Sequence, residues 1–103
     1  MSILMVTYVG GADSRFDRTT YETHHIPLVE RTWAPFGLQR TEVFYAVDPA
    51  TGPDVVAMCL CHFADRAGVD RALAAPESAA VADDIPTFTD IAPMRTVITA
   101  APA

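Results

Sequence analysis

ILMVTYV at residues 3–9 and VVAMCLC at residues 55–61 are the stretches of this 103-residue chain that decide its fold. Both are rich in residues that favour β-strands, and two glycines close the first run. An antiparallel sheet with one face in water alternates apolar and polar residues, but these runs are apolar at odd and even positions alike. They predict a sheet whose two faces are both covered.

The segments around these runs predict helices and further strands. Asp17 offers an N-cap oxygen to a helix that Pro35 and Gly37 then stop. The turn-rich loop DPATGPD, residues 48–54, joins two neighbouring strands as a hairpin. The order βαββαβ is typical of an α+β, ferredoxin-like fold, with helices on one face of a four-stranded antiparallel sheet. In chain order the expected elements are strand 3–9, helix 18–33, strand 38–47, strand 55–63, helix 65–74, a short helix at 78–85 and strand 90–99.

The second face of this sheet needs a cover of its own, because the helices protect only one side. A second copy of the same sheet would supply it, giving a homodimer joined through its sheet faces, a dimeric α/β barrel. A shared face of about 800 Å² per subunit is ordinary for a stable interface. Long central strands that loops bury are the alternative explanation.

Length and composition narrow the class of protein further. The chain fits one domain, residues 1–103, with a modest core. Its net charge is −6 and its seven basic residues are scattered arginines, so nucleic-acid binding is not expected. No stretch is long enough for a membrane span or basic enough for a signal peptide, which predicts a cytoplasmic protein without a membrane partner.

Cys59 and Cys61 are expected to be free, buried thiols that point the same way from one strand.

YETHHIPLVERTW, residues 21–33, places two histidines and a proline inside the first predicted helix. Adjacent helical residues lie about 100° apart, so His24 and His25 are expected to flank one stripe rather than reach the same spot. Pro27 cannot donate to the carbonyl four residues earlier, so the helix should bend or loosen over residues 23–26. Such a helix can line a small polar cleft, and a core segment that happens to contain histidine is the alternative.

Three segments together resemble the EthD-like family of dimeric α/β-barrel proteins. They are the early strand ending in YVGG, the pattern FD(x)3YxTHHIPLVE at residues 16–30 and DDIPTFTDIAP at residues 83–93. The likeness extends over nearly the whole chain. It implies a ferredoxin-like fold, a homodimer joined through its sheets, and a cleft between helices and sheet in each subunit. Its most specific positions are Tyr21, Thr23, His24, Pro27 and Leu28, and then Asp84 to Asp90.

The resemblance also implies a range of activities. Relatives in this superfamily include small cofactor-free monooxygenases, lactone isomerases and dehydratases that act on aromatic or polyketide-like compounds, and fold alone does not choose among them. The family pattern usually has a large apolar residue at position 25, so the matched histidine is His24.

His24 is predicted to be the general acid or base, because an imidazole with a pKa near 6.5 exchanges protons at neutral pH. Asp84 could return near it and orient the ring, and a purely structural tie between helix and loop is the alternative. Predicted contacts to the substrate come from Tyr8, Tyr21, Thr23, His25 and Phe88. Trp33, Phe44 and Tyr45 are further candidates for aromatic walls, and core packing is the alternative for most of these aromatic residues.

Metal and cofactor sites are not expected. Cys59, Cys61 and His62 suggest zinc, but on a strand the histidine faces away from both cysteines and a fourth ligand is lacking. Glycine-rich phosphate loops, the G-x-S-x-G elbow and H-E-x-x-H are also missing from the sequence.

The sequence therefore predicts a homodimer whose cleft binds a hydrophobic small molecule, aromatic or ketone-bearing. Isomerisation, dehydration and cofactor-free oxygenation are the candidate reactions. A non-catalytic carrier or accessory protein of a degradation pathway is the alternative function. A dimerisation module, with the cleft filled by Tyr21, Trp33 and Phe88, is a third.

Overall fold

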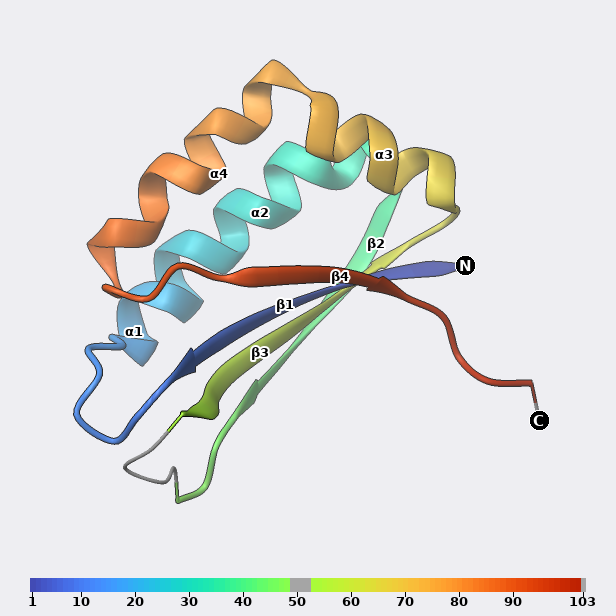
Figure 1. Ribbon diagram of the computed structural model, residues 1–103. Helices are drawn as coiled ribbons and strands as arrows, with labels where there is room; N and C mark the ends of the chain where they lie inside the picture. Colours follow the sequence, from blue (N-terminus) through green and yellow to red (C-terminus); the bar gives the residue numbers. More distant parts are fainter. Residues whose placement is uncertain (49–52, 103) are drawn as a thin grey trace.

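Strands and helices separate into two layers in the computed structural model, which describes residues 1–48 and 53–102 (Figure 1). The strands are β1 (Ser2–Gly10), β2 (Leu38–Tyr45), β3 (Asp54–Phe63) and β4 (Met94–Ile98). They form one antiparallel sheet in the order β2-β3-β1-β4, and the helices lie on one side of it. This is the ferredoxin-like α+β arrangement, so the predicted fold class is confirmed. Residues 49–52 of the loop predicted at 48–54 lie outside the described residues.

The first helical segment runs from residue 18 to residue 33, as predicted, but it is not uniform. It consists of α1 (Arg18–Thr20), a π-helical turn (Tyr21–His25) and α2 (Ile26–Trp33). Asp17 caps its start by accepting a hydrogen bond from the backbone N–H of Thr20, 3.1 Å away. A 3-10 turn (Ala34–Phe36) follows, and Gly37 then adopts a φ of 96°, which glycine tolerates best.

The second helical segment comprises α3 (Arg66–Ala74), a 3-10 turn (Pro76–Ser78), α4 (Ala79–Asp84) and another 3-10 turn (Ile85–Thr87). Asp65 caps α3 through the backbone N–H of Gly68, at 2.7 Å. In Figure 1, α2 and α4 lie side by side above the sheet, and residues from the two helices contact one another. The space between this helix pair and the sheet is where the candidate site lies.

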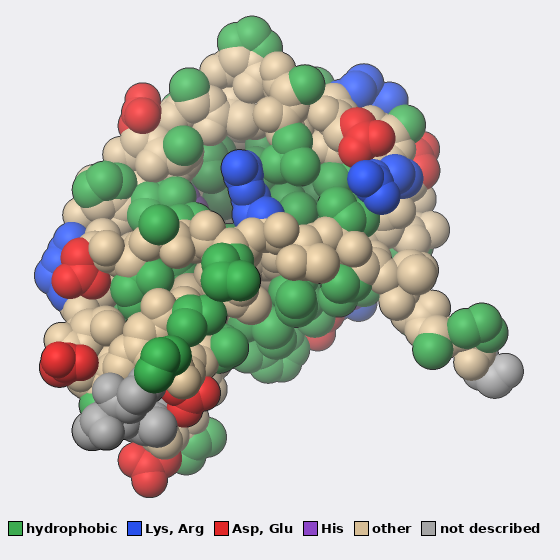
Figure 2. Space-filling model, viewed as in Figure 1, with side chains coloured by type: hydrophobic (Ala, Val, Ile, Leu, Met, Phe, Trp, Pro, Cys, Tyr) green, Lys and Arg blue, Asp and Glu red, His purple; other side chains and the backbone are tan. Residues whose placement is uncertain are grey.

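Strand pairing divides the side chains of the sheet between two faces. Leu4 and Tyr8 of β1 and Cys59 and Cys61 of β3 are buried beneath the helices. The intervening positions form the opposite face, where directly paired residues include Met5 with Leu60 and Met58 with Phe44. Hydrophobic side chains gather on this side, below β4 in Figure 2. We call this surface the outer sheet face. Its apolar residues are Ile3, Met5, Phe44, Met58, Leu60, Met94 and Ile98, and it also carries Thr7, Arg40, Glu42, His62 and Thr96.

The last strand is shorter than predicted. The sequence indicated a strand at 90–99, whereas β4 covers Met94–Ile98. Pro93 precedes it and has no N–H to donate to a ladder, which accounts for the later start. Among the described residues, none of the helices has the length and apolar character needed to cross a membrane.

Candidate functional site

A cavity of about 260 Å³ lies between the helices and the sheet. Its volume is close to the lower end of the range typical of ligand pockets, roughly 300–1,000 Å³. Figure 2 shows the opening as a hollow lined mainly by hydrophobic side chains. Tyr21 and Trp33 line the cavity and do not fill it, so the filled cleft expected of a dimerisation module is not seen. The lining residues are Val6, Tyr8, Tyr21, His25, Ile26, Val29, Trp33, Cys59, Cys61, Ser78, Val81, Ala82, Ile85, Pro93 and Arg95.

The π-helical turn directs His25 into this cavity. The backbone N–H of Ile26 donates to the carbonyl of Tyr21, five residues back, and the turn is therefore wider than an α-helical one. Pro27, which follows directly, has no N–H for the usual bond, so the loosening predicted over residues 23–26 takes this form. The His25 ring stacks on Tyr21, with centroids 5.6 Å apart, and is only 3% exposed.

Asp84 binds both histidines at once. Its Oδ2 lies 2.9 Å from Nδ1 of His25, and its Oδ1 lies 3.0 Å from Nδ1 of His24. The prediction that the adjacent histidines could not reach the same spot was wrong. It assumed the 100° step of an α-helix, whereas the wider π turn and the two oxygens of one carboxylate let both rings approach it.

The environment of His25 favours a neutral ring. Burial lowers its pKa more than the hydrogen bond and charge of Asp84 raise it. Burial acts to raise the pKa of Asp84, but the hydrogen bonds from His25 and His24 outweigh this effect and the pKa is lowered. The neutral imidazole therefore donates its Nδ1–H to a carboxylate, which leaves the lone pair on Nε2.

Nε2 is the ring nitrogen of His25 that Asp84 does not bind. Among residues 1–48 and 53–102 it has no hydrogen-bond partner, yet it is not one of the fully enclosed polar atoms. Since His25 lines the cavity, this nitrogen is accessible to a molecule bound there. A basic nitrogen whose ring is fixed from behind by a carboxylate is the arrangement that general-base catalysis requires.

Two phenols line the same cavity. Tyr8 and Tyr21 are each 1% exposed, and their rings meet edge to face with centroids 5.8 Å apart. Burial first, and then the proximity of Cys59, raises the pKa of both hydroxyls. Both phenols therefore keep their protons at neutral pH and can donate a hydrogen bond to a ligand oxygen.

Cys59 and Cys61 lie on the cavity floor, contributed by β3. Both are free and buried, as predicted, and their sulfurs are 3.7 Å apart. The hydrogen bond from Cys61 lowers the pKa of the Cys59 thiol, and the same bond together with burial raises the pKa of Cys61. The pair provides a soft, polarisable surface beneath a bound molecule.

Trp33 and Ser78 close the end of the cavity nearest α3. The indole N–H donates to Oγ of Ser78 at 2.7 Å, and this hydroxyl donates to the carbonyl of Ala72 at 2.5 Å. With its polar atom satisfied, Trp33 presents an apolar ring to the interior. This fixed wall comes from α2 and the 3-10 turn before α4.

The predicted site residues separate into two groups. Tyr8, Tyr21 and His25 line the cavity, whereas Thr23, His24 and Phe88 do not. The side chain of His24 is 63% exposed on the far side of Asp84, although the predicted contact with that carboxylate is present. The hydroxyl of Thr23 donates to its own helix, at the carbonyl of Thr19. Phe88 is fully buried behind the His25 ring, with centroids 4.6 Å apart, so it supports the histidine and does not face the cavity.

Two other predicted aromatic walls also lie elsewhere. Phe44 is 44% exposed on the outer sheet face. The hydroxyl of Tyr45 donates to Glu22 at 2.6 Å, and its ring lies beneath the guanidinium of Arg18. Neither side chain lines the cavity.

His62 faces away from the two cysteines, as strand alternation predicted. Its Nε2 is hydrogen-bonded to Glu42 on the other side of the sheet. Among the described residues, no group of three or more His, Cys, Asp or Glu side chains is arranged to hold a metal ion.

Sequence reasoning missed Arg95, Ser78 and the two apolar lining residues of α4, Val81 and Ala82. The spacing of four residues between Tyr21, His25 and Val29 was the available signal for His25, since residues at that spacing share a helical face. Arg95 had no such signal, because its direction depends on the register of β4 against β1, where it pairs with Val6. Ser78 was recognisable only as part of a short helix.

No protein-family model matches the sequence, and a search of curated proteins found no match. Solved structures with the same fold do match. An EthD-like protein from Ralstonia eutropha JMP134 is 23% identical with a TM-score of 0.79, over 94% of this chain and 88% of that one. An EthD family protein from Bacillus halodurans C-125 is 21% identical with a TM-score of 0.71, over 98% of this chain and 99% of that one.

SnoaB from Streptomyces nogalater, a cofactor-independent oxygenase, is 18% identical with a TM-score of 0.63, over 99% of this chain and 95% of that one. Identities at this level establish a shared fold. The ferredoxin-like fold of EthD-like proteins is therefore the class to which the structure points, and the resemblance predicted from the sequence is confirmed at the level of fold.

Proposed function

We propose that the protein binds a hydrophobic, aromatic or ketone-bearing small molecule in this cavity and transfers a proton with His25. The observation that carries the proposal is the accessible Nε2 of a buried imidazole whose Nδ1 is bound by Asp84. Proton transfer was predicted for the neighbouring His24, whose exposed ring lies outside the cavity lining. In the proposal, His24 keeps a supporting role as the second donor to Asp84.

The shared step of the candidate reactions is removal of a proton from carbon. Nε2 of His25 takes the proton, and the electrons of the C–H bond move into the adjacent carbonyl to form an enolate. A phenol of Tyr8 or Tyr21 supplies the hydrogen bond that stabilises the enolate oxygen. The imidazolium formed on His25 is stabilised by the carboxylate of Asp84.

The fate of the enolate sets the reaction class. Return of the proton from the His25 imidazolium to another carbon gives isomerisation. Transfer of this proton to a β-hydroxyl, which leaves as water while the enolate electrons form the new double bond, gives dehydration. Attack on dioxygen gives oxygenation without a cofactor. SnoaB, a cofactor-independent oxygenase with this fold, supports the last of these.

Hydrogen–deuterium exchange tests the proton transfer without knowledge of the natural substrate. Aryl ketones and hydroxynaphthalenes are incubated in deuterated water with the wild type, His25→Gln or His24→Gln, and exchange at carbon is followed by NMR. General-base catalysis contributes about 10²–10⁴-fold, so His25→Gln should lose at least about a hundredfold of the catalysed exchange. His24→Gln is the matched control and should stay within about fivefold of the wild type.

Equal exchange rates in wild type and His25→Gln would contradict the proposal. Binding of these compounds without catalysed exchange by any of the three proteins would instead favour the non-catalytic carrier. Circular dichroism of each variant establishes that a loss of exchange does not come from unfolding.

We further propose that a second copy of the chain covers the outer sheet face. Its side chains are mainly apolar, and Phe44 and Met94 are 44% and 59% exposed in the single chain. Large exposed apolar patches mark interaction surfaces. Within the described residues, Nδ1 of the buried His62 also lacks a hydrogen-bond partner on this side of the sheet. Nδ1 is already shielded from water in the single chain, so the apolar side chains are what a facing subunit would cover, and sheet-on-sheet packing is a common arrangement.

A further inference from the structure

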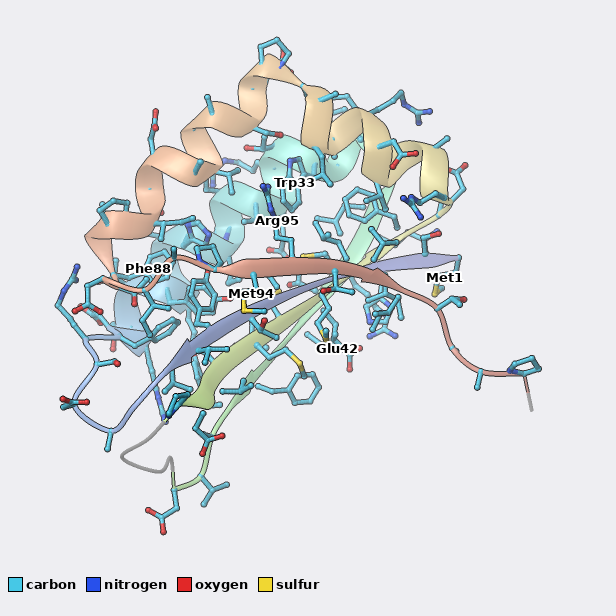
Figure 3. All side chains as sticks on the ribbon, viewed as in Figure 1. Met1, Trp33, Glu42, Phe88, Met94 and Arg95 are labelled. Carbon is cyan, nitrogen blue, oxygen red and sulfur yellow. The ribbon has the colours of Figure 1, made fainter. Side chains whose placement is uncertain are left out.

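Arg95 extends from β4 over the opening of the cavity. It pairs with Val6 across the sheet, and both residues line the cavity, which places its side chain on the helix side. Figure 3 shows Arg95 directed from β4 toward the helices, and Trp33 lines the same cavity. In the same view, Figure 2 shows a basic side chain standing in the middle of the hydrophobic hollow.

The guanidinium of Arg95 has no partner in the described part of the chain. Neither an ion pair nor a hydrogen bond engages it, and its side chain is exposed. Arg40 and Arg66 pair with carboxylates, whereas Arg15 and Arg18 donate to backbone carbonyls. The chain carries an excess of acidic residues, yet Asp and Glu are both missing from the cavity lining. Among the described residues, the cavity therefore has an unpaired cation at its mouth and a mainly apolar interior without a carboxylate.

This combination favours a ligand that is apolar at one end and anionic at the other. A guanidinium presents a planar pair of N–H donors that matches a carboxylate. We propose that the ligand is an aromatic or ketone-bearing carboxylate, whose acid group pairs with Arg95 at the mouth. Its ring or carbonyl then lies inside, against Tyr8, Tyr21 and Nε2 of His25. This inference rests on the proposed function because both place the ligand in the same cavity.

Two ligands of nearly the same shape separate charge from size. Naphthoate and naphthamide differ in carrying a carboxylate or a neutral carboxamide. Trp33 is the single tryptophan of the chain and lines the cavity, so its indole N–H signal in NMR reports binding there and not at the outer sheet face. Titrations of each compound give dissociation constants for the wild type, Arg95→Gln, Arg95→Lys and Arg71→Gln. The last variant changes the net charge equally at an exposed position of α3 outside the cavity lining.

Naphthoate should bind the wild type more tightly than naphthamide does. Partly exposed ion pairs contribute up to about 1 kcal/mol and more where water is displaced, so Arg95→Gln should weaken naphthoate roughly five- to tenfold. The affinity for naphthamide should change by less than about twofold in Arg95→Gln. Arg95→Lys should restore part of the affinity for naphthoate that Arg95→Gln loses, and Arg71→Gln should bind both compounds as the wild type does. The inference would be overturned if the wild type bound the two compounds equally tightly, or if Arg95→Gln weakened the binding of both equally. It would also be overturned if Arg71→Gln weakened naphthoate as much as Arg95→Gln does.

If neither compound moves the Trp33 signal, the inference is overturned as well. The result is separate from the exchange test of His25. A cavity that selects carboxylates through Arg95 but does not catalyse exchange would support this inference and contradict only the proton transfer.

Discussion

Asp84→Asn removes the charge that both histidines share, and the structure sets the size of the effect. Asp84 is 8% exposed and accepts from His25 at 2.9 Å, so that bond is charge-assisted and shielded from water. Such bonds contribute about 1.5–3 kcal/mol to the free energy of unfolding, against about 1 kcal/mol for a neutral hydrogen bond. The substitution should therefore cost about 1 kcal/mol at the bond from His25. His24 is 63% exposed, and its bond adds only about 0.5 kcal/mol.

The sum of about 1.5 kcal/mol corresponds to a fall in Tm of about 6–12 °C for a domain of this size. Thermal unfolding followed by circular dichroism, at one protein concentration and pH 7, measures it. Asp83→Asn is the matched control, because this neighbouring aspartate is exposed and its substitution changes the net charge equally. Asp83→Asn should stay within about 0.5 kcal/mol of the wild type. Equal stability of the two variants would refute the idea that the shared carboxylate fixes the helix pair.

The remaining predictions concern the pH dependence of stability, dimer formation through the outer sheet face, and the packing of Gly68 against Phe36. The pKa of His25 is lowered in the folded protein, so the unfolded chain binds a proton on this ring first as the pH falls. The free energy of unfolding should therefore fall as the pH drops below about 6.5, by up to about 1.4 kcal/mol per pH unit. Urea titrations of His25→Gln should lack this component. In sedimentation measurements the wild type should be a dimer, and Leu60→Asp on the outer sheet face should convert it to a monomer. Leu73→Asp, at an exposed leucine of α3, should leave the dimer intact. A wild type that sediments as a monomer at tens of micromolar would contradict the dimer. Gly68→Ala should lower the free energy of unfolding by about 1–3 kcal/mol in urea titrations, because the added Cβ would overlap the carbonyl oxygen of Phe36. Alanine favours helix more than glycine does, so a stabilised variant would contradict this packing.

The fold was predictable because its signals are local. Apolar residues at both odd and even positions of the two central runs indicated strands covered on both sides. Asp17 and Asp65 marked helix starts that the structure confirms. Glycine and proline marked the ends of the helices. Strand ends were less certain, since Pro93 delays β4 relative to the predicted 90–99 strand.

The site was only partly predictable because its geometry depends on a departure from regular structure. The rule of 100° per residue holds for an α-helix, and the π turn at Tyr21–His25 breaks it. The sequence showed that Pro27 must loosen the helix and that His25 is spaced to share a face with Tyr21 and Val29, but not that a π turn would let both histidines reach Asp84. Arg95 depends on strand register, which long-range pairing sets and the local sequence does not record.

The central claim is that His25 is a neutral base with its free nitrogen in the cavity. NMR of the imidazole nitrogens tests it most directly, with His24→Gln and His25→Gln used to assign the signals. We predict that His25 at pH 7 carries its proton on Nδ1, bound to Asp84, and that its Nε2 signal moves when an aromatic ligand is added. A proton on Nε2, a charged imidazolium at pH 7, or an Nε2 signal that no ligand moves would contradict the claim.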